Sequence, residues 1–111
     1  FVKDTARGFL SIFKAESLVG EVTNVGMNEE ISVGDLVSLI AGLMNTEVEI
    51  LTEELRTRPE ASEVMRLRCN NSKLVTNTDW RPRYRLRDGI AETIEWLRAH
   101  SGLYKAQIYN V

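Results

Sequence analysis

A short stretch of the chain, residues 56–64, carries residue types suited to binding a phosphorylated sugar. It reads Arg-Thr-Arg-Pro-Glu-Ala-Ser-Glu-Val. Because Arg58 precedes a proline, its backbone is predicted to be extended, on a loop. There its planar guanidinium can donate two parallel hydrogen bonds to a phosphate. Glu63, further along the loop, can accept hydrogen bonds from sugar hydroxyls. A solvated surface loop is the ordinary interpretation of this pattern, and a phosphate site at Arg58 is the alternative.

The motifs that perform catalysis are missing from the sequence. No Gly-x-Gly-x-x-Gly or Gly-x-x-Gly-x-x-Gly is present to hold a dinucleotide pyrophosphate at a helix start. No tyrosine is followed four residues later by a lysine. The single histidine, His100, is predicted to cap a helix end, where a cation is favoured by the helix dipole. We therefore predict no catalytic residue in this chain.

Composition bounds the class of protein. The 111 residues are 43% hydrophobic and 27% charged, which is typical of one globular domain. A net charge of −2 argues against nucleic-acid binding, and the arginines that alternate through residues 81–87 are predicted to lie on a solvated loop. Cys69 is the only cysteine, which predicts a reducing, cytoplasmic location and, with one histidine, no zinc site. The longest apolar run, residues 39–44, is too short to span a membrane.

The first expected helix begins near Asp4, a residue type that can cap a helix start. Ala6, Phe9, Leu10 and Phe13 recur at helical spacing, so they share one face. We predict that this face packs in the core.

Three further helices are expected. Ser32 and Asp35 have capping-box spacing at the start of the second, which is predicted to stop at Asn45. A short helix follows residues 70–72, and the last helix spans residues 87–100. Its inward positions are predicted to be Ile90, Ile94, Leu97 and Trp96.

Extended segments are predicted between these helices. Residues 21–26 are rich in β-branched side chains and bounded by glycines, which is typical of a strand. Residues 48–51 are predicted to be a second strand, and residues 64–69 an extended segment. Because the first strand lies between two amphipathic helices, we expect it to belong to a larger parallel sheet, in an α/β fold.

Taken in order, short motifs along the chain resemble the carboxy-terminal part of the extended short-chain dehydrogenase/reductase family, the nucleotide-sugar epimerases and 4,6-dehydratases. The resemblance covers essentially all 111 residues, and it depends on the order and spacing of the motifs rather than on any one of them. The motifs are residues 1–8, 20–26, 30–36, 58–64, 70–73, 79–82 and 89–96. Two positions depart from the family pattern: Asn70 replaces a common aspartate, and Asp79 replaces the glycine that usually precedes the tryptophan.

The resemblance implies roles for individual residues. Arg58 would contact the diphosphate of a nucleotide-sugar, and Glu63 its ribose. The loop looks most like that of the UDP-N-acetylglucosamine 4,6-dehydratases, so a UDP-sugar is the expected ligand. The parent enzyme would use tightly held NAD, whereas this chain lacks the glycine-rich turn and the Tyr/Lys pair and is expected to be inactive alone.

The resemblance also implies an organisation. Residues 1–31 would be the last helix and strand of a Rossmann-type sheet, and residues 32–111 the small carboxy-terminal substrate-binding lobe. The abrupt start at Phe1 favours a boundary inside a larger protein. The alternative is a free-standing interaction module that forms a homodimer through an exposed strand edge at residues 22–25.

Overall fold

The computed structural model describes residues 1–51 and 66–103, and every regular element in those two ranges is helical. No strand is present in them. The elements in chain order are α1 (Val2–Lys14), the 3-10 helix η1 (Glu16–Leu18), α2 (Val33–Met44), α3 (Ser72–Asn77), α4 (Leu86–Ala99) and the 3-10 helix η4 (Ser101–Leu103).

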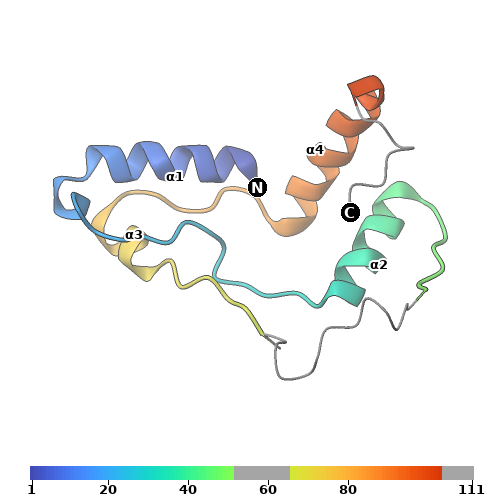
Figure 1. Cartoon of the computed structure of the whole chain (residues 1–111), viewed down its shortest axis with the longest axis horizontal. Helices are drawn as coiled ribbons and strands as arrows, with labels where there is room; N and C mark the ends of the chain where they lie inside the picture. The colour runs from blue at the N-terminus through green and yellow to red at the C-terminus, as the bar shows by residue number, and fades with distance from the viewer. Residues whose placement is uncertain (52–65, 104–111) are drawn as a thin grey trace.

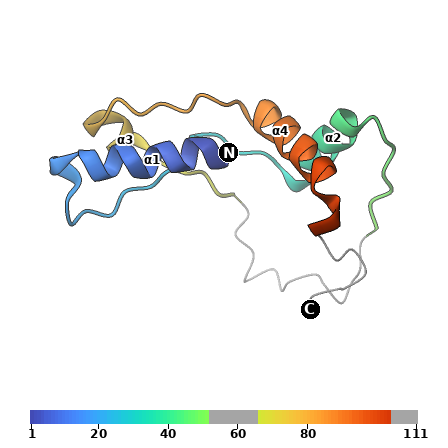
Figure 2. The same cartoon turned by 90° about the horizontal axis from the view of Figure 1, so that it is seen from above.

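The helices form two arms joined by extended segments. Figure 1 shows α1 and α3 at one end of the molecule and α2 and α4 at the other, and Figure 2 shows the same separation from above. The radius of gyration is 17.6 Å, whereas a compact domain of this length has one of about 13 Å. The chain is therefore much more open than an ordinary domain.

The core is small and lies in the arm that contains α1 and α3, called the first arm below. Leu18, Leu74 and Trp80 form a buried cluster, and Leu74 has 0% of its surface exposed. Partly buried side chains pack around it: Ile12, Ala15, Val25 and Val75. This cluster joins the end of α1 to α3 and to the segment that follows α3.

α1 presents an unexpected side to this core. Its buried residues are Asp4 and Gly8. The predicted core face is turned outward instead, with Phe9 64% and Phe13 86% exposed. The prediction that this face packs in the core is therefore wrong. Gly8 explains the orientation, because a Cβ at Gly8 would lie closer than 3.0 Å to a methyl group of Val25, so the glycine permits a close approach that a larger residue does not.

The predicted strand at residues 21–26 is an irregular segment. Its backbone carbonyls are bound by side chains rather than by a neighbouring strand. The Lys73 ammonium donates to the Val22 carbonyl at 2.9 Å, and the Asn71 amide donates to the Gly26 carbonyl at 2.7 Å. A β-rich sequence forms a ladder only beside a second strand, and the described residues supply none.

The predicted α/β class is therefore contradicted by the helical structure of the described residues. The expected terminal strand of a Rossmann-type sheet is missing from residues 21–26. Residues 48–51, predicted to be a second strand, are likewise irregular. Residues 66–69, the described part of the predicted extended segment, lie in no helix or strand. The exposed strand edge at residues 22–25, on which the predicted homodimer depended, does not exist as a strand.

The predicted helices are present in the structure, with bounds close to those expected. Ser32 caps α2, accepting a hydrogen bond from the Asp35 backbone N–H at 3.0 Å. Asn45 ends α2 in the left-handed conformation, with φ of 51°. α3 and α4 lie within one residue or two of their predicted ranges. Ile94 of α4 is buried as predicted, but Leu97 and Trp96 are exposed.

Candidate substrate-binding site

The two residues predicted to bind substrate, Arg58 and Glu63, lie in residues 52–65, outside the described part of the chain. The described residue that follows this stretch is Arg66. Its guanidinium forms an ion pair with Glu30, just before α2 begins. Arg66, where the described chain resumes after the candidate stretch, is therefore beside the start of α2.

A polar hollow of about 600 Å³ lies at this point. Its walls come from the start of α2 and from the segment after the candidate loop: Glu30, Ile31, Ser32, Val33, Asp35, Arg66 and Leu67. The start of a helix favours an anion, but two carboxylates, those of Glu30 and Asp35, line this hollow. Ser32 is already engaged, because its hydroxyl donates to the Asp35 carboxylate at 2.6 Å. The described walls therefore offer a phosphate no unpaired guanidinium, and the phosphate prediction depends on Arg58.

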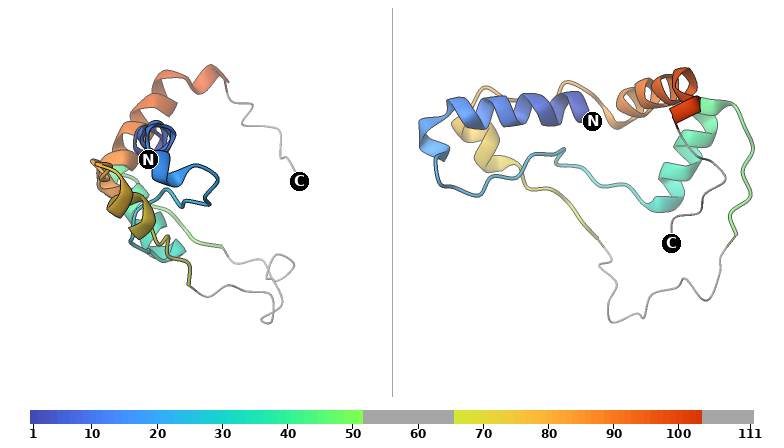
Figure 3. Two further views of the ribbon diagram at one scale, coloured as in Figure 1. Left: turned by 90° about the vertical axis from the view of Figure 1, so that its left-hand side faces the viewer. Right: turned by 45° about the horizontal axis from the view of Figure 1, so that its top comes forward.

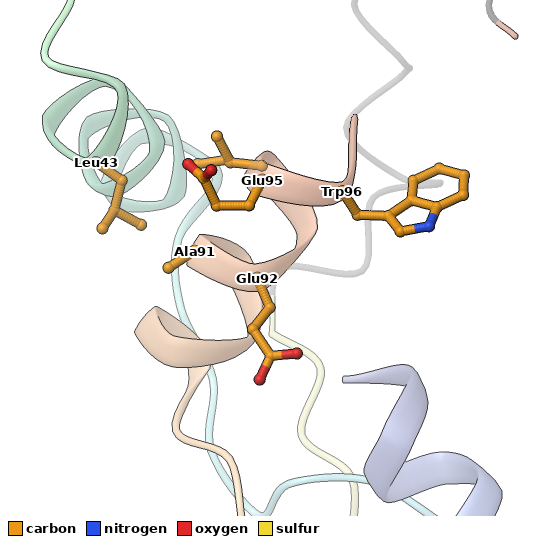
Figure 4. A pocket seen from close by; sticks show the side chains of 6 residues that line it. Leu43, Ala91, Glu92, Glu95 and Trp96 are labelled. Atoms are coloured by element: carbon orange, nitrogen blue, oxygen red, sulfur yellow. The ribbon is translucent and has the colours of Figure 1, made fainter. Parts of the chain in front are cut away.

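A second, mostly apolar hollow of about 510 Å³ lies between α2 and α4. Figure 4 shows Leu43 on α2 and Ala91 on α4 beside this space, and Trp96 of α4 also lines it. The charged residues at its edge are Glu92 and Glu95. They are paired with Lys3 and Arg98, respectively. Both carboxylates at the edge of this hollow are therefore engaged in exposed ion pairs.

The most connected polar group in the described residues is Asp4, which is 5% exposed. Its carboxylate accepts hydrogen bonds from the backbone N–H of Arg83 at 3.0 Å and 3.1 Å and from that of Tyr84 at 3.0 Å. The Arg7 guanidinium donates to it at 2.6 Å. In addition, the Trp80 indole N–H donates to the Asp4 backbone carbonyl at 3.0 Å.

These contacts decide the charge state of Asp4. Burial raises the pKa of the carboxyl, but the N–H groups of Tyr84 and Arg83, together with the Arg7 and amino-terminal charges, outweigh it, so its pKa lies below the ordinary value. Sequence reasoning took Asp4 for a helix cap, whereas the cap residue of α1 is Phe1. No local pattern reveals the true partners, because they lie 79 and 80 residues away.

The arginines of residues 81–87 behave in two ways. Arg81 is bound to the end of α3 and the turn after it, since its guanidinium donates to the carbonyls of Val75, Thr78 and Trp80. Arg83 and Arg85 precede α4 and are exposed, as predicted for a solvated loop. Arg87 is also exposed, but it lies in the first turn of α4, so the loop prediction is wrong at that position. His100 is also exposed, and its Nδ1 lies 2.8 Å from the Trp96 carbonyl at the end of α4.

The described residues contain neither a cluster of metal-ligand side chains nor a glycine-rich helix start. No group of three or more His, Cys, Asp or Glu side chains in residues 1–51 and 66–103 is placed to hold a metal ion. α2, whose first turn contains the single glycine Gly34, offers no glycine-rich turn for a pyrophosphate. In the same two ranges, no helix has the length and apolar character needed to cross a bilayer.

Comparison with known proteins gives two related matches. The chain is similar to the dTDP-D-glucose 4,6-dehydratases of Homo sapiens and of Bos taurus, with 30% identity to each over 103 residues. The alignment covers 88% of this chain and 28% of each relative, so the chain spans less than a third of the length of the curated relatives it matches. No protein-family model matches, and no solved structure matches. The similarity is to one part of these nucleotide-sugar dehydratases, and it does not single out enzymes that act on UDP-N-acetylglucosamine.

Proposed function

We propose that this chain is the substrate-binding carboxy-terminal portion of an NAD-dependent nucleotide-sugar epimerase or dehydratase, and that it is inactive alone. The observation that carries the proposal is the 30% identity to dTDP-D-glucose 4,6-dehydratases across 88% of the chain. Because the chain has no dinucleotide motif and spans only 28% of those relatives, the proposal places NAD and its chemistry in other parts of a longer protein.

In this proposal Arg58 binds the diphosphate and Glu63 the ribose of the nucleotide-sugar. A guanidinium is suited to this role because it stays charged and its planar fork matches two phosphate oxygens. The ion pair of Arg66 with Glu30 brings the described residue that follows the stretch 52–65 beside the start of α2. The polar hollow at the start of α2 adjoins that point.

The outward face of α1 supports a larger protein. This apolar face, defined by Val2, Phe9, Leu10 and Phe13, is exposed along the length of the helix. An exposed apolar patch of this kind marks a contact with another body. We place residues 1–31 against the NAD-binding part of the longer protein through this face, and residues 32–111 in the lobe that covers the substrate.

Two nucleotide-sugars are candidate ligands, and each is supported by a different observation. The loop at residues 58–64 resembles that of enzymes acting on UDP-N-acetylglucosamine, whereas both relatives are named for dTDP-D-glucose. Both contain the diphosphate that Arg58 is proposed to bind, so the same arginine is tested with either.

The test is calorimetric titration of the chain with UDP-N-acetylglucosamine and, separately, with dTDP-D-glucose. An Arg58→Ala variant is measured in parallel, with Arg68→Ala as a matched control, because Arg68 is an exposed arginine outside the proposed site. Loss of a charge-assisted bidentate contact predicts binding at least about tenfold weaker in Arg58→Ala and unchanged binding in Arg68→Ala. Equal binding by both variants, or none by the wild-type chain, would contradict a substrate site in this chain.

A second candidate function is a self-associating module without enzymatic activity. The strand edge first expected to form its homodimer is not present in the described residues, but the outward face of α1 offers another surface. Sedimentation equilibrium separates the candidates. A defined dimer that a Phe9→Asp substitution dissociates would favour the module, and nucleotide-sugar binding by a monomer would favour the dehydratase portion.

A further inference from the structure

The two arms of the molecule are held together at a narrow junction. Figure 3 shows that the segment leading into α4 runs past the start of α1, so α1 and the α2–α4 arm meet there. Several ties join the amino-terminal end of α1 to the residues around the start of α4. They include the Asp4 carboxylate on the Arg83 and Tyr84 amides, the Phe1 ring on the Tyr84 ring with centroids 4.7 Å apart, and the Lys3–Glu92 ion pair.

These ties differ in strength. Lys3 and Glu92 are both largely exposed, and surface ion pairs contribute little. The Asp4 side chain is buried, and its hydrogen bonds join an ionised carboxylate to backbone N–H groups, which makes them about twice as strong as neutral hydrogen bonds. A backbone donor also moves with its chain, so holding the amides of residues 83 and 84 fixes the path of the segment that enters α4.

The packing around the junction agrees with a fixed geometry. A Cβ at Gly89, in the first turn of α4, would lie 2.9 Å from the Cβ of Phe1. α4 therefore approaches the start of α1 more closely than a larger residue at position 89 would permit. Asp4 lies within the same junction, three residues further along α1.

We propose that Asp4 is a positioning residue that sets the placement of the α2–α4 arm relative to α1. α4 packs against α2, and the stretch carrying Arg58 follows α2. If the proposed function holds, Asp4 therefore also orients the arm that carries the substrate loop. The placement of the arm does not itself depend on that function.

The role is distinct from stabilising the core. The cluster of Leu18, Leu74 and Trp80 lies in the first arm, away from the α2–α4 pair. Loss of the Asp4 carboxylate therefore removes one buried tie between the arms and leaves the ring contact and the exposed ion pair in place. The apolar contacts of the first arm also remain. The measurable consequence is a change in the distance between arms with the helices retained.

The experiment measures that distance with two spin labels on the full 111-residue chain. Cys69→Ser removes the native thiol, and cysteines replace Ser17, an exposed residue of η1, and Gly42, where an added Cβ meets nothing within 4 Å. Asp4→Asn keeps the shape of the side chain and removes its charge. Asp35→Asn is the matched control, because Asp35 is an exposed residue whose carboxylate accepts its described hydrogen bond from the Ser32 hydroxyl of its own helix cap.

The expected result is one narrow distance distribution in the labelled parent and in Asp35→Asn, and a shifted or broadened one in Asp4→Asn with unchanged helical circular dichroism. An unchanged distribution in Asp4→Asn would overturn the proposal. If Asp4→Asn loses its helices, amide hydrogen exchange of the wild-type chain decides. The Arg83 and Tyr84 amides are expected to be protected at least as strongly as those of α4, and exchange at free-peptide rates would overturn the proposal.

Titration with the two nucleotide-sugars separates this inference from the proposed function. A changed distance in Asp4→Asn, in a chain that binds neither ligand, supports the positioning role and contradicts the substrate site. An unchanged distance, in a chain that binds through Arg58, does the reverse.

Discussion

Gly8 offers a sharp test of how α1 sits on the rest of the chain. An alanine at Gly8 would place its Cβ closer than 3.0 Å to Val25 Cγ1, 3.3 Å from Val25 Cγ2 and 3.4 Å from the Trp80 indole nitrogen. Val25 cannot easily withdraw, because a β-branched side chain is stiff about χ1 and Val25 packs against the core cluster. Either Val25 or the helix must move.

Two effects of opposite sign decide how much Gly8→Ala changes the free energy of unfolding. Alanine in place of glycine inside a helix stabilises by about 1 kcal/mol, while overpacking a packed site costs about 1–3 kcal/mol. With a contact this short and a stiff neighbour, the cost is at the upper end. We therefore expect Gly8→Ala to lower the free energy of unfolding by about 1–2 kcal/mol.

Gly42 is the matched control. It is also a helical glycine, but an added Cβ there meets nothing within 4 Å. Gly42→Ala is therefore expected to raise the free energy of unfolding by up to about 1 kcal/mol. Both variants are measured by urea unfolding followed by circular dichroism at 222 nm, a wavelength that reports helix, with roughly equal slopes expected for the transitions.

A double-mutant cycle with Val25→Ala identifies the clash. Removing both methyl groups of Val25 gives the alanine at position 8 room, so the double variant should be no less stable than Val25→Ala alone, with a coupling energy of about 1–2 kcal/mol. If Gly8→Ala instead stabilises the chain as much as Gly42→Ala does, the close packing of α1 on residue 25 is refuted.

Three further predictions follow from individual contacts. The folded-state pKa of Asp4 lies below its unfolded value of about 3.9. The contribution of Asp4 to stability is therefore present above that value and is lost as the pH falls through the folded pKa. When the free energy of unfolding is measured against pH, Asp4→Asn should make its fall at acidic pH less steep. Ser32→Ala removes the α2 cap and should cost about 1 kcal/mol in urea unfolding, whereas Ser32→Asp should preserve most of it. Phe13→Asp, on the exposed face of α1, should reduce light scattering at high protein concentration and lower the free energy of unfolding by no more than about 0.5 kcal/mol. A large loss of stability would show that Phe13 is buried in solution.

The parts of the fold that depend on neighbouring residues could be predicted from the sequence. The start of α2 at Ser32 and its end at Asn45 follow from side-chain capping and from a residue that tolerates the left-handed conformation. Asn70 likewise accepts a hydrogen bond from the Ser72 N–H at the start of α3. These signals span three or four residues, so they do not need the rest of the chain.

The predictions that were wrong concern residues whose partners are distant in the sequence. Residues 21–26 have the composition of a strand, but whether a ladder forms is decided by a neighbouring strand, and here Lys73 and Asn71 bind the carbonyls instead. Asp4 was assigned to its own helix because its true partners, the amides of Arg83 and Tyr84, are unrelated to it in sequence spacing. For the candidate site, Arg58 and Glu63 lie outside the described residues, so their roles stay predictions.

The orientation of α1 joins these observations to the proposed function. An isolated chain gains most by burying the apolar face of an amphipathic helix, and each large side chain contributes about 1.5–3 kcal/mol when it is fully buried. α1 instead turns Asp4 and Gly8 inward and leaves Phe9 and Phe13 exposed. Its inner face is fixed by specific contacts, the Asp4 carboxylate on two backbone amides and the bare Gly8 against Val25. A helix with a specified inner face and an apolar outer face is suited to lying between two bodies. The small core of this chain is one body, and the NAD-binding part of a longer nucleotide-sugar enzyme is the one that we propose for the other.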